Sequence, residues 1–419
     1  MSPSRREFLR TSAALAGASL VLPKDAFSGR QAEEIRIGLI GCGGRGKGAA
    51  HDALKSHKGA RLVAMGDAFA DRLAEGIADL TKRHPDRVDV PTERAFVGFD
   101  AVEKVLAQDV DVVILATPPH FRPDHFKMAV AAGKHVFMEK PVAVDGYGVR
   151  TVLAAALEAK AKKLNVVVGL QRHYQNGYRA AMEHIHSGRI GMIVAARAYW
   201  NMGALWSRPR QPEWSDLEFQ MRNWLYYAWL SGDHIVEQHV HNLDVINWAK
   251  RDYPVLALGV GGREVRKDPL FGHIYDHHGV HFQYADGSWL FSQCRQIPGC
   301  SNRVSEHVIG TQGTADFEGD SYRIRAHGFD VPLWEYEGPH NNPYRTEHEE
   351  LLAAVAEGRH AYSDAENGAR STLTAIMGRM ATYSGRDVTA EEALKAERLG
   401  PKEYAFGSAA FPGVAVPGV

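Results

Sequence analysis

Cysteine is scarce in this sequence: only Cys42, Cys294 and Cys300 occur among 419 residues. Three thiols cannot form the set of disulfides that stabilises small secreted domains. Cys42 lies within a glycine-rich stretch, where its side chain is expected to fill a small space rather than to act as a reactive thiol. The fold must therefore rest on apolar cores, and a chain of this length is long enough to form two of them.

An excess of either charge is also lacking, because 49 Lys and Arg residues stand against 50 Asp and Glu residues. No basic stripe interleaved with aromatic residues occurs, so a nucleic-acid partner is not indicated. Internal repeats and low-complexity blocks are missing as well. Histidine, by contrast, is abundant at 21 residues, which leaves acid–base and metal chemistry open.

Long apolar runs are missing too. The mildly apolar segment 11–23 is too short to serve as a membrane anchor in the mature protein. Paired arginines precede it in the segment 4–10, and this arrangement resembles a twin-arginine export signal. We therefore expect residues 1–32 to form a signal and linker, and the mature protein to be periplasmic or otherwise extracytoplasmic. This route exports folded proteins, so it favours an enzyme that loads its nucleotide early and holds it tightly.

A glycine-rich turn dominates the part of the chain that follows. The β-branched run Ile35–Ile40 ends at Gly41, Gly43 and Gly46, and a helix-prone, alanine-rich segment comes next. This pattern predicts the strand, tight turn and helix of a dinucleotide site, with the helix N-terminus facing the phosphates. A second apolar strand at 61–65 leads into Asp67, about 20 residues further on, where an acid can bind the adenosine ribose. An acid there favours NAD over NADP, because it repels a 2′-phosphate.

The order of predicted elements divides the chain. Up to residue 170, strands at 35–40, 61–65, 111–117, 135–138 and 166–169 alternate with helices, which predicts a doubly wound, parallel Rossmann sheet over residues 33–170. Beyond it, strands at 193–200, 255–260, 277–284, 288–296, 304–310 and 313–318 are partly joined by hairpins. They predict an α+β domain over 171–390, built on a large, mainly antiparallel open sheet with helices at 345–357 and 365–383. Residues 391–419 read as an extended tail.

Several motifs occur at strand ends, where open α/β sheets bind ligands. Lys140 follows the predicted strand 135–138 within Glu139-Lys140-Pro141, and the segment 171–174 follows the strand 166–169. Together with the glycine turn and Asp67, these motifs resemble the Gfo/Idh/MocA family, the glucose–fructose oxidoreductase and inositol dehydrogenase group, over residues 33–390. The resemblance implies an NAD-dependent oxidoreductase that acts on a carbohydrate or polyol hydroxyl.

The family's motif Asp-x-Gly-x-His-x-x-Asp corresponds here to residues 237–244. The resemblance implies that His241 is the catalytic base, that Lys140 orients the substrate hydroxyl, and that Asp244 is the acid after the histidine. Glu237 replaces the usual Asp and His239 replaces the usual Gly, so the chain departs from the family at two positions. Glu237 and His241 are four residues apart, which would place both on one helical face beside Lys140.

The expected site comprises catalytic residues, cofactor contacts and substrate contacts. The catalytic residues are Lys140, Glu237 and His241. The expected cofactor contacts are Gly41, Cys42, Gly43, Gly44, Arg45, Gly46, Asp67, Thr117, Pro118, His120, Glu139, Lys140 and Gln171. The expected substrate contacts are Lys140, Arg172, His173, Tyr174, Trp224, Glu237 and His241. The aromatic segment 200–229 fits either core packing or sugar stacking.

The same region also offers ligands for a metal ion, because imidazole and carboxylate side chains are concentrated there. The members are Asp233, His234, Glu237, His239 and His241. Such ligands suit Zn, Fe or Mn. Because their spacing is not that of a zincin motif and the family normally needs no metal, no metal is assigned.

A second histidine group, His277, His278 and His281, lies on a predicted strand, with His277 and His281 on one face. This group fits either a solvated sheet face or substrate contact.

Two other functions stay open at this stage. One is a redox-neutral, NAD-dependent glycoside hydrolase, which would oxidise a sugar carbon transiently, cleave the glycosidic bond and return the hydride. The other is a non-catalytic sugar- or nucleotide-binding protein. In this family the antiparallel sheet is typically open on one face and covered by partner subunits, so the resemblance also implies a homodimer or homotetramer.

Overall fold

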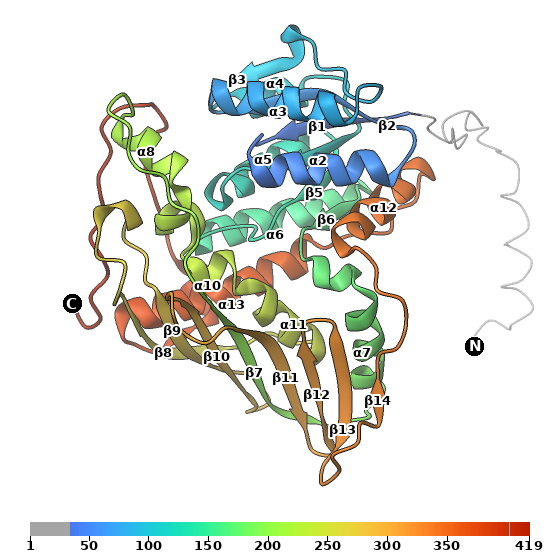
Figure 1. The fold of residues 1–419 in the computed structure, drawn as a ribbon, viewed down its shortest axis with the longest axis vertical. Coiled ribbons are helices and arrows are strands. Elements are labelled where there is room, and N and C mark those ends of the chain that lie inside the picture. The colour runs from blue at the N-terminus through green and yellow to red at the C-terminus, as the bar shows by residue number, and fades with distance from the viewer. Residues whose placement is uncertain (1–33, 402) are drawn as a thin grey trace, which may run out of the picture.

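The computed structural model describes residues 34–401 and 403–419 (Figure 1). The predicted export signal lies outside the described residues. Within the described part, no helix has both the length and the apolar character that a membrane span requires.

The first sheet is parallel and has six strands, as its alternating sequence pattern predicts. The strands are β1 (Ile35–Ile40), β2 (Ala60–Asp67), β3 (Ala95–Val97), β4 (Val112–Leu115), β5 (His135–Met138) and β6 (Val166–Val168). Their order is β3-β2-β1-β4-β5-β6, with every neighbouring pair parallel. The direction of the strand order reverses between β1 and β4, so the carboxyl ends of these two strands form a topological switch point. Ligands bind at such a point in open α/β sheets.

Helices cover both faces of this sheet. They are α2 (Gly44–Ser56), α3 (Ala70–Arg83), α4 (Ala101–Leu106), α5 (Arg122–Ala131) and α6 (Gly146–Ala161), joined late in the chain by α12 (Pro343–Ala356). Alternate residues of each strand enter two different cores. Val113 and Leu115 pack with helices α4 to α6, whereas Val112 and Ile114 pack with α2 and α12. Burial on both faces explains why β4 is an uninterrupted apolar run.

The second sheet has nine strands in the order β14-β13-β12-β11-β7-β10-β9-β8-β15. They are β7 (Ile193–Met202), β8 (Leu256–Gly262), β9 (His277–Gln283), β10 (Trp289–Gln296), β11 (Arg303–Gly310), β12 (Gly313–Glu318), β13 (Ser321–Ala326), β14 (Trp334–Glu335) and β15 (Val388–Thr389). All neighbours are antiparallel except β7 and β10. The predicted hairpin is present, since Gln283 of β9 pairs with Trp289 of β10.

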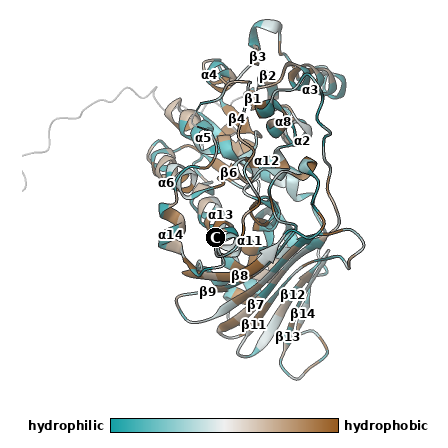
Figure 2. Cartoon of the chain, turned by 90° about the vertical axis from the view of Figure 1, so that its left-hand side faces the viewer, coloured by the Kyte–Doolittle hydropathy of each residue, from teal (hydrophilic) through white to brown (hydrophobic). Residues whose placement is uncertain are grey.

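Helices lie on one face of the nine-stranded sheet (Figure 2). They are α7 (Asn176–His186), α10 (His234–Glu237), α11 (Val240–Lys250) and α13 (Ala365–Ser384), with the short α14 (Ala390–Lys395) beside α13. Inward residues such as Val280 and Phe282 are buried, while Phe291 faces outward and is exposed. The long helix α13 packs on β8 and β9 and also on α6, so it joins the two sheets. Within the described chain, nothing covers the other face.

The aromatic segment predicted at 200–229 leaves the second sheet after β7. It forms the short helices α8 (Asp216–Arg222) and α9 (Ala228–Ser231), with a 3-10 turn at Trp224–Tyr226 between them. The C-terminal tail runs beside α8 (Figure 1). Both segments pack against the first domain, at the edge of the sheet where its strands end.

Candidate functional site

The glycine turn forms a cradle at the start of α2. Gly41 has φ +94°, and a Cβ there would lie 2.6 Å from the backbone of Ala116, while a Cβ on Gly46 would collide with the Gly41 carbonyl. Gly43 and Gly44 face open space, since a Cβ on either would meet no described atom within 4 Å. Among the described residues no side chain caps α2, so its first amides are free to bind phosphate oxygens.

Asp67 fixes this turn to the end of β2. Its carboxylate accepts hydrogen bonds from the Cys42 amide at 2.7 Å and from the Phe69 amide at 2.9 Å. Burial raises the pKa of Asp67, and the two amides oppose that shift. The Cys42 side chain is buried below the turn, where a Cβ on Gly76 would touch it at 3.0 Å, so it fills space as expected.

A cavity of about 450 Å³ adjoins the cradle. The first domain lines it with the glycine turn, with Asp67 and Phe69 after β2, and with Thr117 and Pro118 after β4. The aromatic segment lines the opposite side through Trp206 and Trp224. The volume lies in the range of small-molecule and cofactor sites. Trp224, predicted to contact substrate, lines this cavity.

Four arginines also line the cavity: Arg45 of the glycine turn, and Arg72, Arg208 and Arg222. Arg222 binds both carboxylate oxygens of Asp71, at 2.8 and 3.0 Å, and covers the Phe69 ring at 4.1 Å. This pair connects α8 to α3 across the cavity mouth. Burial, together with the neighbouring Arg72, lowers the pKa of Arg208.

The C-terminal tail packs against the same end of the cavity. The ring of Phe406 stacks on that of Phe69 with a centroid distance of 5.4 Å, and its centroid lies 5.0 Å from that of Phe99. Phe69 and Phe99 both line the cavity. Backbone hydrogen bonding continues the contact, because the Leu217 amide of α8 donates to the Gly407 carbonyl at 3.2 Å. We call Tyr404–Ala410 the tail strap.

His120 contacts this strap and is not among the residues that line the cavity. Its Nε2 is 2.6 Å from the Tyr404 hydroxyl, and its ring packs edge-on against Trp229. Burial lowers the pKa of His120 to about 3, so the ring is neutral. The structure thus gives the residue predicted as a cofactor contact a packing role.

The predicted catalytic residues meet at the ends of β5 and α10. Lys140 Nζ donates to Glu237 Oε1 at 2.7 Å and also to the Glu237 carbonyl. The carboxylate of Glu237 therefore directly orients the lysine. Glu237 ends α10, whereas His241 lies in the first turn of α11, so the two residues belong to separate helices and not to the single helix that was predicted.

His241 is held in a buried, cationic environment. Its ring stacks on Trp200 at 5.8 Å, and its Nδ1 has no hydrogen-bond partner among the described residues. Burial, with the nearby cations of Lys140 and Arg172, holds the pKa of His241 well below its ordinary value. The imidazole is therefore neutral and able to accept a proton.

His239, the second departure from the family motif, points away from this group. Its Nε2 lies 2.7 Å from the Ser292 hydroxyl of β10, and burial lowers its pKa to about 3. The ring thus connects the turn between α10 and α11 to the second sheet.

Arg45, Glu139 and Glu347 form a polar group where α2, β5 and α12 meet. The guanidinium of Arg45 binds Glu139, and its Nη2 is 3.5 Å from Glu347 Oε1. Its central carbon lies 5.0 Å from the centroid of the Tyr344 ring. Both Glu347 oxygens are buried without a hydrogen-bond partner in the described chain. Burial, together with the neighbouring Glu139, raises the pKa of Glu347 well above its usual range. Unsatisfied polar atoms beside the cradle fit a site that a polar ligand completes.

The predicted Gln171 is beside this group, where its Nε2 donates to the Tyr344 hydroxyl at 3.2 Å and its Oε1 is buried without a partner among the residues described. The cradle, the cavity and these unpaired polar atoms together fit a dinucleotide.

Three predicted substrate residues and the family's acid are engaged in buried contacts of their own. Arg172 binds Glu306, which also accepts from the Tyr178 hydroxyl at 2.8 Å. His173 Nε2 lies 2.8 Å from Asp244, whose carboxylate also binds Asn367 and Ser371. The Tyr174 hydroxyl donates to Asp364. These contacts engage Arg172 Nη1, His173 Nε2 and the Tyr174 hydroxyl, so a carboxylate from another part of the chain orients each side chain.

Sequence reasoning missed Glu306, Glu347 and the tail strap. Glu306 carried a usable signal, because it occupies an inward position of β11 between two apolar inward positions, Val304 and Val308. A charge there requires a buried partner. Glu347 carried none, since its burial depends on α12 packing against α2.

Comparison with known proteins agrees with this geometry. Residues 35–170 match the Gfo/Idh/MocA family profile, described as an oxidoreductase family with an NAD-binding Rossmann fold. The chain is 29% identical to inositol 2-dehydrogenase of Serratia proteamaculans over 297 residues, which are 70% of this chain and 77% of the relative. It is 28% identical to inositol 2-dehydrogenase of Rhizobium meliloti over 338 residues, 77% of this chain and 89% of the relative.

Solved structures share the fold. A levoglucosan dehydrogenase in complex with NADH and levoglucosan superposes with a TM-score of 0.64 at 19% identity, covering 85% of this chain and 99% of that chain. At this identity, the likeness concerns the arrangement of the two sheets and their helices. Residues 35–170 of this chain are therefore similar to the Gfo/Idh/MocA family of oxidoreductases in its NAD-binding Rossmann fold.

Proposed function

We propose that the protein oxidises a secondary hydroxyl of a polyol or sugar with NAD. The observation that carries this proposal is the convergence of Lys140, Glu237 and a neutral, buried His241 at the carboxyl edge of the Rossmann sheet. The inositol 2-dehydrogenase relatives favour a polyol or sugar as substrate.

The residues divide the chemistry among them. Lys140, oriented by Glu237, donates a hydrogen bond to the substrate hydroxyl oxygen, and His241 accepts the hydroxyl proton. A bound nicotinamide supplies the hydride acceptor, so the carbon loses its hydride as the carbonyl forms. Positive charge at Lys140 stabilises the oxygen as it loses its proton. Because Lys140 disfavours a second cation nearby, it also keeps His241 ready to act as a base.

We further propose that the dinucleotide is retained between turnovers. The tail strap and α8 both lie over the end of the cavity that Asp67 and Phe69 line. The ion pair between Arg222 of α8 and Asp71 of α3 connects α8 to the first domain. Release of the nucleotide would require these contacts to open. Retention suits the export proposed for residues 1–32, since an exported enzyme meets little free nucleotide.

The test is the absorbance at 340 nm of the purified protein with NAD and a panel of polyols, aldoses and aryl glycosides. We expect substrate-dependent reduction of the nicotinamide by at least one polyol or sugar, and its loss in Lys140→Met. Lys160→Met, at an exposed lysine of α6 in the same domain, is the matched control and should keep the signal. Phenol release from a glycoside without net reduction would instead support the redox-neutral hydrolase. The absence of any response, with no nucleotide bound, would contradict the proposal.

A further inference from the structure

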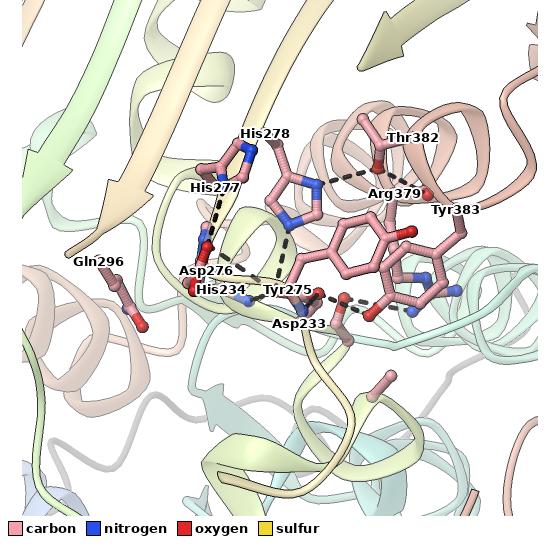
Figure 3. Close-up of polar contacts among 12 residues, drawn as sticks. Asp233, His234, Tyr275, Asp276, His277, His278, Gln296, Arg379, Thr382 and Tyr383 are labelled. Atoms are coloured by element: carbon pink, nitrogen blue, oxygen red, sulfur yellow. Dashed lines mark hydrogen bonds and ion pairs between the residues drawn. The ribbon is translucent and has the colours of Figure 1, made fainter. Parts of the chain in front are cut away.

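A second polar cluster lies apart from the Lys140 site, where α10, β9 and α13 meet (Figure 3). Asp233, His234 and His278 are all buried, and their ligand atoms lie within 4.8 Å of one another. The cluster differs from the group suggested by sequence spacing, because Glu237 and His239 are bound to Lys140 and Ser292 instead.

The hydrogen bonds of His278 define which of its nitrogens carries a proton. Thr382 Oγ1 is positioned to donate its single proton to the carbonyl of Gly378 or Arg379, at 3.1 and 3.0 Å. A hydroxyl that donates to either carbonyl accepts from His278 Nδ1, which is 2.9 Å away. In the neutral ring, Nε2 then presents a lone pair, and that lone pair faces Asp233 Oδ1 at 3.3 Å. Two acceptors at this distance repel each other unless a cation lies between them.

Asp233 is held in place from its other side. Oδ2 accepts from the Tyr383 hydroxyl at 2.6 Å and from the Tyr275 amide at 2.9 Å, so Oδ1 is turned toward the histidines. The backbone of Asp233 has φ +74°, a conformation that non-glycine residues adopt rarely. Outer contacts of this kind orient the ligands of metal sites.

His234 supplies a third possible ligand atom for a metal ion. A proton shared between Asp233 and His278 would need no such third group. Its Nδ1 lies 3.8 Å from Asp233 Oδ1, and its Nε2 has no hydrogen-bond partner in the part of the chain described. The residue is 1% exposed, so water does not satisfy that nitrogen from outside. Donors around one zinc ion lie roughly 3.5 Å apart, as bond lengths of about 2.0–2.2 Å imply, so donors that lie within 4.8 Å of one another would close by up to about 1 Å around the ion.

We propose that Asp233, His234 and His278 bind one first-row divalent metal ion, with zinc best suited to this imidazole and carboxylate set. The ion connects α10 to β9, and through Thr382 and Tyr383 to α13. His234 begins α10 and Glu237 ends it, so the ion fixes the short helix that presents Glu237 to Lys140. Hydride transfer does not pass through this site, which places the inference beyond the proposed function.

The test is metal content, measured without nucleotide or substrate. Untagged full-length protein is dialysed against Zn²⁺ and then against metal-free buffer, and zinc is counted by mass spectrometry. We expect about one equivalent per chain, and a Tm that falls when a chelator removes it. Co²⁺ in its place should give the visible absorption of a tetrahedral or five-coordinate ion.

His234→Gln removes one ligand while leaving the Tyr275 and Tyr383 contacts of Asp233 intact, so it should fold and lose the equivalent. Asp233→Asn should lose it as well. His277→Gln is the matched control, since His277 is adjacent to His278 but half-exposed and paired with Asp276. Wild-type protein that retains no zinc, or His234→Gln that retains as much as wild type, would overturn the proposal in favour of a proton shared by Asp233 and His278.

Discussion

At the scale of single residues, the site depends on one neutral histidine beside one cation. His241→Asn removes the proposed base, and we expect kcat/KM to fall by roughly 10²- to 10⁴-fold, the usual contribution of general base catalysis. His186→Asn, a histidine of α7 that lies away from the site, should leave kcat/KM unchanged. Circular dichroism checks that both variants fold. A His241→Asn enzyme with wild-type turnover would contradict the assignment.

The same histidine predicts the pH profile. Burial and the Lys140 cation hold the pKa of His241 below its ordinary value of about 6.5, so the neutral base is already the main form at pH 6.5. The acid limb of kcat/KM should therefore lie below pH 6.5. In Lys140→Met, the acid limb of the residual activity should move to higher pH than in wild type. The reason is that the variant lacks the Lys140 cation, which lowers the pKa of His241. An unshifted limb would show that another group titrates.

Asp67 predicts nucleotide preference. Its carboxylate faces the cavity end where an adenosine 2′-hydroxyl is expected, but Arg72 and Arg208 line the same cavity. Asp67→Ser should weaken NAD binding by several-fold and strengthen NADP binding, because the repelling carboxylate is lost while the arginines stay. The Kd values for both nucleotides measure this. Unchanged discrimination would place the adenosine elsewhere.

Glu306 predicts stability rather than binding. Glu306→Ala leaves the Arg172 guanidinium buried without its carboxylate, and loss of one partner of a buried pair costs about 3–5 kcal/mol. We expect a clear fall in Tm. Glu318→Ala, on the exposed end of neighbouring β12, should change Tm little. Equal Tm values for the two variants would contradict the buried network.

At the scale of elements, the tail strap is the least expected feature. Phe406→Ala removes the ring that stacks on Phe69 and Phe99, so nucleotide should dissociate at least several-fold faster. Val416→Ala, exposed in the same tail, is the control. Nucleotide retained after dialysis is measured in the denatured supernatant. Equal retention in both variants would show that the strap does not hold the cofactor.

Elements were predictable from the sequence where their own residues specify them. The buried runs that become β1, β4 and β5, and the hairpin of β9 and β10, carry periodicity and turn signals. The three-residue β3, the two-residue β14 and β15, and the short helices α8 to α10 do not. Their hydrogen bonds depend on neighbours far along the chain, as when Val388 of β15 pairs with Ala257 of β8.

The site shows the same division. Gly41, Gly43 and Asp67 could be placed because the turn and the strand end are local. Arg172 and His173 could not, because their partners Glu306 and Asp244 are 134 and 71 residues away in sequence. Strand ends indicate which residues reach the edge of a sheet. They do not reveal which of those side chains another element has already bound.

At the scale of the whole molecule, the uncovered face of the nine-stranded sheet predicts self-association. Val260 is 78% exposed and Phe291 is 41% exposed on that face. Light scattering should give a homodimer or homotetramer, and Phe291→Lys should weaken it, because the charge would be buried in the interface. Leu157→Lys, at an exposed position of α6, should leave the mass of the assembly unchanged. A wild-type monomer would contradict this expectation.

The most direct test of the central claim follows one hydrogen atom. The protein is incubated with NAD and a polyol or sugar that the absorbance assay identifies, deuterated at its carbinol carbons, and the reduced nucleotide is analysed by mass spectrometry. We predict one deuterium on the nicotinamide, formed by wild type and at least roughly 10²-fold more slowly by His241→Asn. Reduced nucleotide without deuterium, or oxidised product with no change in the nucleotide, would contradict hydride transfer at this site.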